Sequence, residues 1–157
     1  MSVAIRGFEP ADLEELKRIT IACFNGVAFD QMIEDRFGLL NGTDWRSRKA
    51  RQIEDDVTTN AAGVFVAEEN GKILGYITST VDRVAGKGRI PNLAVSAKAQ
   101  GKGVGRHLIQ HALDYFKREG MAYAVIETMA GNEVGQHLYS SCGFVEIGRQ
   151  VQYAMKL

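Results

Sequence analysis

Three glycines stand at alternate positions in the stretch QGKGVG, residues 100–105, and this cluster constrains the fold strongly. It follows a short apolar run, Leu93 to Val95, and precedes a pattern typical of an amphipathic helix. Glycine inside regular structure costs roughly 0.5–1 kcal/mol relative to alanine, so three together indicate that the backbone itself has a role. A strand, a glycine turn and a helix in succession predict free backbone N–H groups at the positive end of a helix, which suit a pyrophosphate. Close packing in a tight turn is the alternative.

The spacing of this loop excludes two familiar phosphate-binding motifs. A P-loop requires G-x-x-x-x-G-K-[ST], but Arg106 stands five positions after Gly101. A dinucleotide fingerprint requires G-x-G-x-x-G, but its last position falls on Arg106 counted from Gly101 and on Leu108 counted from Gly103. The loop instead fits Q-x-x-G-x-G, with Gln100, Gly103 and Gly105.

Hydrophobic periodicity and turn signals predict an α/β sheet domain with strands of mixed direction. Asn70-Gly71 joins two β-rich runs within residues 63–81 and is a strong hairpin signal. Asp44 is expected to cap a helix in the segment 25–60, and Gly143 to end a short helix. The other expected elements are a strand at 3–8, a helix from Pro10, a β run at 89–95, a helix after the glycine loop, a strand at 121–129 and a last strand at 151–157 with Val151, Tyr153, Met155 and Leu157 on one face.

The composition is that of one globular domain over residues 1–157, with 45% hydrophobic and 24% charged residues. The formal net charge of zero gives no long-range attraction to nucleic acid or to an anionic membrane, so neither is expected as a partner. The first residues lack the layout of a signal peptide, and no apolar run approaches membrane-spanning length. Because Cys23 and Cys142 lie far apart in such a chain, we expect reduced thiols and a cytoplasmic location.

A second motif lies downstream of the glycine loop. Asn132, Tyr139 and Gly143-Phe144 form the pattern N-x₆-Y-x₃-G-F. With both motifs in order, the sequence resembles the GNAT superfamily of acyl-CoA-dependent N-acyltransferases over nearly its whole length except residues 25–60, the variable acceptor side of that family. The resemblance implies a mixed, mostly antiparallel sheet with splayed middle strands and helices on both faces.

The resemblance also implies acetyl-CoA as co-substrate. Its pyrophosphate is expected on the amides of residues 100–105, and its pantetheine arm is expected to pair with the backbone of Leu93 and Val95. The strands that end in NLAV and in AVIETM are expected to splay apart, with Pro91 beside the gap. The implied CoA-binding residues are Leu93, Ala94, Val95, Gln100, Gly101, Lys102, Gly103, Val104, Gly105, Arg106 and Asn132.

Acyl transfer to an amine requires a base, because an alkylamine is almost wholly protonated at pH 7. Glu127 is the candidate, since it shares strand parity with Tyr123 and Val125 and would have a raised pKa if that face were buried. Some members of the family that the sequence resembles, especially those that acetylate peptide N-termini, carry a glutamate five residues before the motif asparagine, the place that Glu127 occupies relative to Asn132. An outward-facing or salt-bridged glutamate is the alternative. Asn92, near the other strand, cannot act as a base.

Tyr139 is the candidate acid, placed by the resemblance to donate a proton to the departing thiolate. A core tyrosine that packs the last helix onto the sheet is the alternative. Asn132 suits either of two roles, orienting the pantetheine or capping a helix. A backbone N–H near Leu93 is expected to polarise the acetyl carbonyl. The basic run WRSRKAR, residues 45–51, is expected to be a solvated helix face rather than a phosphate-binding patch.

The resemblance implies an N-acetyltransferase that moves acetyl from acetyl-CoA to a primary amine of a small molecule, or to a peptide or protein amino group, by direct attack in a ternary complex. A GNAT-fold module that binds acyl-CoA or regulates a partner without turnover is the alternative. Zero net charge disfavours an acceptor amine on tRNA. No metal is expected, because His107 and His111 stand four apart without a third ligand. The sequence does not identify the acceptor and leaves a homodimer open.

Overall fold

The strands form two sheets that meet side by side in the computed structural model, which describes residues 2–157. The first sheet has the order β1-β2-β3-β6 and is antiparallel throughout, with β1 (Ala4–Gly7), β2 (Phe65–Glu69), β3 (Lys72–Ile77) and β6 (Leu93–Val95). The second has the order β4-β5-β7, with β4 (Thr80–Asp82), β5 (Lys87–Ile90) and β7 (Tyr123–Ile126). β5 and β7 pair in parallel, whereas β4 and β5 pair antiparallel.

A break at Pro91 and Asn92 separates the two sheets. β5 ends at Ile90 and pairs with β7, while β6 begins at Leu93 and pairs with β3. Proline has no backbone N–H to donate to a ladder, so it is compatible with a position where pairing changes partners. The predicted splay between the middle strands is therefore confirmed, and the fold class expected from the sequence is confirmed with it.

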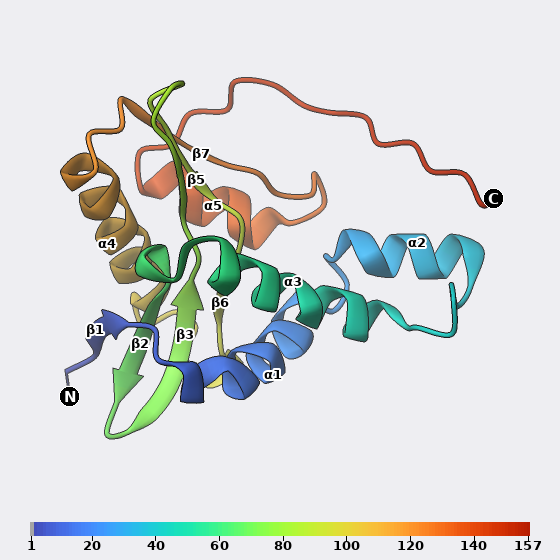
Figure 1. The fold of residues 1–157 in the computed structure, drawn as a ribbon, viewed down its shortest axis with the longest axis horizontal. Coiled ribbons are helices and arrows are strands. Elements are labelled where there is room, and N and C mark those ends of the chain that lie inside the picture. Colours follow the sequence, from blue (N-terminus) through green and yellow to red (C-terminus); the bar gives the residue numbers. More distant parts are fainter. Residues whose placement is uncertain (1) are drawn as a thin grey trace.

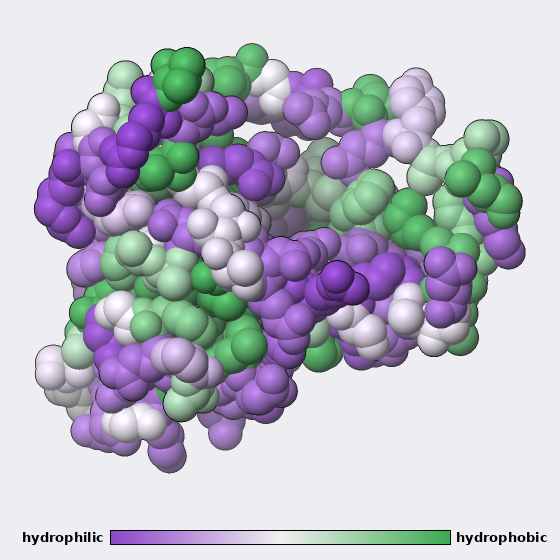
Figure 2. All heavy atoms as spheres, viewed as in Figure 1, coloured by the Kyte–Doolittle hydropathy of each residue, from purple (hydrophilic) through white to green (hydrophobic). Residues whose placement is uncertain are grey.

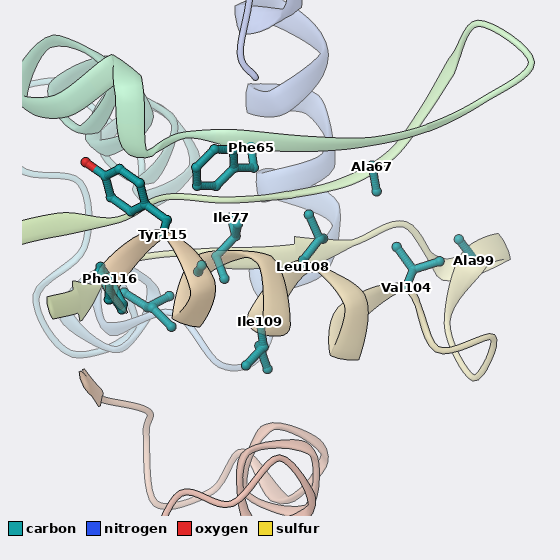
Figure 3. Packing of buried hydrophobic residues seen from close by; sticks show 11 residues of the cluster. Phe65, Ala67, Ile77, Ala99, Val104, Leu108, Ile109, Tyr115 and Phe116 are labelled. Atoms are coloured by element: carbon teal, nitrogen blue, oxygen red, sulfur yellow. The ribbon is translucent and has the colours of Figure 1, made fainter. Parts of the chain in front are cut away.

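Helices cover both faces of the first sheet (Figure 1). α1 (Leu13–Phe24) and α3 (Trp45–Asn60) lie on one face, and α4 (Val104–Arg118) packs on the other. Strand parity explains the division, because alternate residues point to opposite faces. Val66 and Tyr76 belong to the core beneath α1 and α3, whereas Phe65 and Ile77 belong to the core beneath α4 (Figure 3). The remaining helices are α2 (Phe29–Phe37) and α5 (Glu133–Ser141), with single turns at Pro10–Asp12, Ala61–Gly63 and Ala97–Ala99.

The local signals in the sequence have clear structural counterparts. Asn70 and Gly71 have φ angles of 52° and 74°, the left-handed conformation that a two-residue hairpin turn requires. Asp44 caps α3 by accepting a hydrogen bond from the N–H of Ser47 at 2.9 Å. Gly143, with φ of 99°, follows the end of α5. These three predictions are confirmed.

The predicted last strand at 151–157 is wrong for this structure. The segment 145–157 is extended but belongs to neither sheet, and it runs away from the body after α5 (Figure 1). In the space-filling view it is separated from the rest of the molecule by open space (Figure 2). A strand exists only where a second strand takes up its backbone hydrogen bonds, and among residues 2–157 none pairs with this segment. β7 is also shorter than the predicted strand at 121–129.

Within residues 2–157, no helix has both the length and the apolar character that crossing a lipid bilayer would require.

Candidate active site

The glycine loop presents a row of unpaired backbone donors. Gly101 and Gly103 have φ angles of 74° and 82°, which side-chain-bearing residues rarely adopt. The first backbone bond of α4 runs from the N–H of His107 to the carbonyl of Gly103 at 3.0 Å. From Gly101 to Arg106 the backbone N–H groups have no acceptor among residues 2–157. They lie at the N-terminus of α4, where the helix dipole adds partial positive charge.

Gly105 serves a different purpose from the other two loop glycines. A Cβ atom at Gly105 would lie 3.0 Å from Cδ2 of Leu138, so that side chain of α5 would have to move by a few tenths of an ångström. Close packing, the alternative interpretation of the loop, therefore applies at this position. Gln100 fixes the start of the loop, because its amide nitrogen donates to the carbonyl of Val95 at 3.0 Å.

Backbone groups of β6 point into the gap between the sheets. Thr78 donates its N–H to the carbonyl of Asn92 at 2.9 Å, so the even-numbered residue faces β3. Alternate residues of an antiparallel strand bond to the same neighbour, so Leu93 and Val95 direct their backbone groups to the opposite edge. Among the described strands, β6 pairs with β3 alone, so no strand occupies this opposite edge, although the carbonyl of Val95 accepts from the amide of Gln100 and from the thiol of Cys23, both at 3.0 Å.

The other predicted CoA-binding side chains are divided between core and surface. Ala94 and Val104 are buried, and the backbone of Ala94 pairs with Tyr76 of β3, so neither side chain is exposed to a ligand. Lys102 is exposed at the tip of the loop. The guanidinium of Arg106 donates to the carbonyl and the hydroxyl of Ser141 at 3.0 and 2.9 Å and so ties α4 to α5.

Tyr139 is half-buried on α5, beside the core under α4. Its ring meets that of Phe144 at a centroid distance of 6.5 Å. Burial raises the pKa of the phenol, so the hydroxyl stays protonated at neutral pH. That hydroxyl makes no hydrogen bond to any residue within 2–157, so the ring is fixed while its proton remains free to be donated.

Asn132 caps α5, which is one of the two roles that suited it. Its side-chain oxygen accepts from the N–H of Gly135 at 3.1 Å, and its amide nitrogen donates to the hydroxyl of Thr128 at 2.9 Å. The cap holds the first turn of the helix that carries Tyr139.

Glu127 is not on a buried face. β7 ends at Ile126, so the strand parity that predicted burial stops one residue short. The side chain of Glu127 is 63% exposed and accepts from Nε of Arg89 at 3.4 Å. Of the two positions considered for Glu127, the buried one is wrong, and the salt-bridged one describes its place in the structure.

A buried polar network, missed in the sequence, occupies the break between β5 and β6. The ammonium of Lys49 donates to Oδ1 of Asn92 at 2.7 Å, and Nδ2 of Asn92 donates to Asp56 at 2.6 Å. The hydroxyl of Thr78 also donates to Asp56, at 2.8 Å. Asn92 thus bridges a cation and a carboxylate from the same helix.

Burial shifts both charged ends of this network. It raises the pKa of the Asp56 carboxyl, although the hydrogen bonds from Asn92 and Thr78 oppose the change. It lowers the pKa of the Lys49 ammonium, which also lies 4.0 Å from the centre of the Phe24 ring. The expectation that residues 45–51 form a solvated face is therefore wrong at Lys49.

One sequence signal could have revealed the network. Lys49 and Asp56 fall at helical spacing on the face that also carries Trp45 and Ile53, both buried. Charged residues on an otherwise apolar helix stripe are rarely buried unless they are paired.

A cavity of about 340 Å³ opens beside this network. It lies on the face covered by α3, opposite the face that carries α4 and the glycine loop. Two carboxylates and one guanidinium are at its wall, which suits a cationic guest with a hydrogen-bonding group. Its lining residues are Gln52, Asp55, Asp56, Arg89, Pro91 and Asn92.

The two helix histidines do not gather metal ligands around them. The ring of His111 packs against that of Phe65 with a centroid distance of 4.4 Å, and burial lowers the pKa of the His111 imidazole. Among residues 2–157 there is no group of three or more histidine, cysteine, aspartate or glutamate side chains arranged to hold a metal ion.

Comparisons with known proteins agree with this geometry. The chain is 30% identical over 160 residues to a mycothiol acetyltransferase of Cellulomonas flavigena, which covers 96% of this chain and 43% of that protein. It is 33% identical over 82 residues to the ribosomal protein bS18 alanine N-acetyltransferase of Escherichia coli, covering 52% of this chain and 54% of that one. The chain therefore spans about half the length of the curated relatives it matches.

A solved structure shows the same fold. The PaiA N-acetyltransferase of Thermoplasma acidophilum, crystallised in complex with coenzyme A, superposes with a TM-score of 0.73 at 20% identity. The match covers 92% of this chain and 91% of that one. The profile of the Acetyltransferase (GNAT) family matches residues 27–144. The chain belongs to the GNAT acetyltransferase family.

Proposed function

We propose that the protein is an acetyl-CoA-dependent N-acetyltransferase that transfers acetyl to a primary amine by direct attack in a ternary complex, within one domain of residues 1–157. The observation that carries the proposal is the gap between β6 and β7. It has free backbone donors at the glycine loop on one side and a polar cavity on the other. The acetyltransferase activity of relatives such as those from Cellulomonas flavigena and Escherichia coli supports the same reaction class.

The donor side is proposed to hold acetyl-CoA through the backbone. The N–H groups from Gly101 to Arg106 would bind the pyrophosphate, since they are unpaired and lie at a helix N-terminus. The backbone of Leu93 and the N–H of Val95 would pair with the amides of the pantetheine arm, as an added strand does. The carbonyl of Val95 would join them only on release from Gln100 and Cys23. When bound there, acetyl-CoA supplies an activated acetyl thioester.

Two side chains are proposed to move protons on either side of the gap. Glu127, directly or through a water, takes a proton from the ammonium so that the nitrogen lone pair can attack the thioester carbonyl. The new C–N bond replaces the C–S bond, and the hydroxyl of Tyr139 donates its proton to the departing sulfur. The acylated nitrogen then releases its second proton to solvent, and the Tyr139 phenolate takes a proton back from solvent. The raised pKa of Tyr139 keeps that proton in place until negative charge develops on the sulfur.

Glu127→Gln should lower kcat/KM most at low pH, where little free amine exists, and least at high pH. Loss of a general base typically costs about 10²–10⁴-fold. The pH–rate profile of both proteins with one amine acceptor checks this. Arg89→Gln is the matched control, because it breaks the same ion pair and leaves the carboxylate. An equal loss in both variants would assign Glu127 a role in holding Arg89 rather than in moving a proton.

The acceptor is proposed to be a cationic amine, either of a small molecule or at a peptide or protein N-terminus. Asp55 and Asp56 at the cavity would attract the ammonium. Of the relatives named above, one is named for a small molecule, mycothiol, and the other for the alanine of a ribosomal protein. We further propose a cytoplasmic location, supported by the free thiols of Cys23 and Cys142, and a homodimer.

A thiol-release assay with acetyl-CoA against small amines, amino acids and N-terminal peptides tests the reaction. Calorimetry with acetyl-CoA tests the donor site separately. Turnover with at least one amine class is the expected result. Binding without turnover for every class would favour the alternative, a module that senses acyl-CoA, and absence of binding to folded protein would overturn both.

A further inference from the structure

Strand parity places Arg89 on the face of the second sheet that borders the cavity. Its neighbours in β5 point the other way, because Ile90 belongs to the core beneath α4 and a Cβ atom at Gly88 would overlap the ring of Phe116 on α4. Since alternate residues of a strand point to opposite faces, the side chain of Arg89 points toward α3. There it lines the cavity together with two carboxylates of that helix, and 44% of the side chain is exposed.

The two side-chain amides of the cavity wall are already paired. The amide of Gln52 accepts from Lys49 and donates to Asp30, both at 2.9 Å. The amide of Asn92 is likewise used on both sides, in the buried network described above. These amides are held in place by the protein itself, and they shape the wall without adding charge to it.

The unpaired groups of the wall carry opposite charges. Nη1 and Nη2 of Arg89 have no acceptor among residues 2–157, since its one bond in that range runs from Nε to Glu127. Oδ1 of Asp56 has no donor in the same part of the chain, because both of its hydrogen bonds go to Oδ2. The exposed carboxylate of Asp55 also lines the cavity. The cavity therefore offers free donors at one end and free carboxylate oxygens at the other.

This arrangement distinguishes between kinds of cationic guest. A diamine or polyamine would place positive charge near Arg89 and leave its free nitrogens without an acceptor, and like charges brought together are costly. A molecule with both an ammonium and a carboxylate would satisfy both ends, since the guanidinium fork binds a carboxylate through two parallel hydrogen bonds. The volume of about 340 Å³ lies at the small end of ligand pockets, which span about 300–1,000 Å³.

We propose that the acceptor is a free amino acid, whose carboxylate binds the guanidinium of Arg89 and whose ammonium binds Asp56. The inference rests on the proposed function, because it names a substrate class for the same cavity. Arg89 would thereby bring the acceptor to the guanidinium that Glu127 contacts. A peptide N-terminus fits less well, because its first carboxyl group is an amide and offers no anion to Arg89.

Kinetics with matched acceptors test the assignment. Alanine, leucine, serine and lysine would each be compared with their own amides, which keep the amine but replace the carboxylate by an uncharged group. A carboxylate favours the protonated form of a nearby amine, so the amide has more free amine at neutral pH. A preference for the acid therefore reports recognition of its carboxylate. For at least one pair, kcat/KM of wild type should be at least tenfold higher for the acid.

Two variants on one face of β5 separate carboxylate binding from a general effect of charge. Arg89→Gln should lower kcat/KM at least tenfold more for the acid than for the amide, because only the acid loses a charge-assisted pair. The loss of the ion pair with Glu127 affects both acceptors and cancels in this comparison. Lys87→Gln removes the same charge from a residue that shares strand parity with Arg89 but does not line the cavity, so it should keep the preference. Neither side chain is buried, so both variants should stay folded.

Three results would overturn the inference. Amides or N-terminal peptides that wild type acetylates as well as the acids would show that no carboxylate is recognised. An equal loss for acid and amide in Arg89→Gln would assign Arg89 only the role of holding Glu127. Turnover confined to amines without a carboxylate would contradict the amino acid while leaving the proposed acetyltransferase intact.

A fourth result separates the inference from the proposed function. If no amine of any class is turned over, the proposed function fails, and calorimetric titration with each acid and its amide then tests the cavity directly. Binding of an acid that Arg89→Gln weakens at least tenfold would support the site for an amino acid. Absence of binding, or equal binding of acid and amide, would overturn it.

Discussion

Asn92 lies in the two-residue interval between β5 and β6, where no ladder holds the backbone on the β7 side. Its side chain compensates with polar bonds, accepting from Lys49 and donating to Asp56. Buried charges are costly unless they are paired, and here a neutral amide connects both to one point of the sheet. The break in the sheet is thereby held open by a defined set of contacts.

Asp56→Asn is expected to stabilise the protein at neutral pH. Burial raises the pKa of Asp56 above its unfolded value of 3.8, so ionisation lowers the stability of the native state as pH rises through the folded pKa. Asparagine keeps an oxygen that can accept from Asn92 and Thr78 but does not ionise. The gain should shrink as pH falls toward 4 and vanish below 3.8, where wild-type Asp56 is protonated in both states.

Urea unfolding of both proteins at a series of pH values measures this gain. Asp55→Asn is the control, since Asp55 is the exposed neighbour on the same helix, and it should change stability little. A variant that is less stable than wild type at pH 7 would mean that the ionised Asp56 is needed to compensate Lys49.

Tyr139→Phe should reduce kcat by about 10²–10⁴-fold while leaving acetyl-CoA affinity nearly unchanged. The change keeps the ring against Phe144 and removes only a hydroxyl that bonds to no described residue. The lost interaction strengthens as charge develops on sulfur, so it acts on the transition state. Single-turnover rates and CoA titrations in both proteins check the prediction, with Tyr123→Phe as a control on an exposed tyrosine. A wild-type rate would make Tyr139 a packing residue.

At the scale of elements, α4 and its glycine loop combine two uses of glycine. Gly103 and Gly120 flank the helix with nearly equal φ angles of 82° and 80°, and a Cβ at either would meet nothing within 4 Å. Gly103→Ala and Gly120→Ala should therefore each lower the free energy of unfolding by a similar amount, on the order of 1–2 kcal/mol for a residue in the left-handed conformation.

Only Gly103→Ala should also weaken acetyl-CoA binding, because only that end of α4 carries the free N–H groups. Calorimetric titration of both variants, with unfolding midpoints measured in parallel, separates backbone strain from loss of binding. We expect at least a tenfold weaker affinity for Gly103→Ala and an unchanged one for Gly120→Ala. Equal affinities in both would place the pyrophosphate away from this loop.

Elements that depend on local chemistry were predictable from the sequence. The hairpin at Asn70-Gly71, the cap at Asp44 and the end of α5 before Gly143 each require a specific backbone conformation or side chain. The buried face of α4 followed from its helical period. The network of Lys49 and Asp56 could not be predicted, because it depends on how α3 meets a break between strands distant in sequence.

The segment 145–157 is a case in which a recognisable sequence pattern did not predict the structure. The period-two pattern of residues 151–157 predicted a strand, but a strand also needs a partner strand, and the sequence does not identify that partner. Burial of Glu127 was not predictable for a smaller reason: strand parity extends only as far as the ladder, and the ladder ends at Ile126.

At the scale of the whole molecule, two sheets share one gap and one uncovered segment (Figure 1). The homodimer proposed above would couple folding to association. The thermal midpoint of the wild type should then fall on dilution, because mass action favours the separated chains. Scans over a hundredfold range of protein concentration measure this, and a constant midpoint would contradict a dimer that stabilises the folded chain.

The cavity beside Asp56 and the glycine loop lie on opposite faces of the molecule and meet only at the gap. Each substrate would then enter the gap from its own face of the molecule. Binding of one substrate would not obstruct binding of the other, and release of one product would not depend on release of the second. The architecture therefore imposes no compulsory sequence of arrival and departure, and any such order measured by product inhibition would have to come from motion rather than from shape.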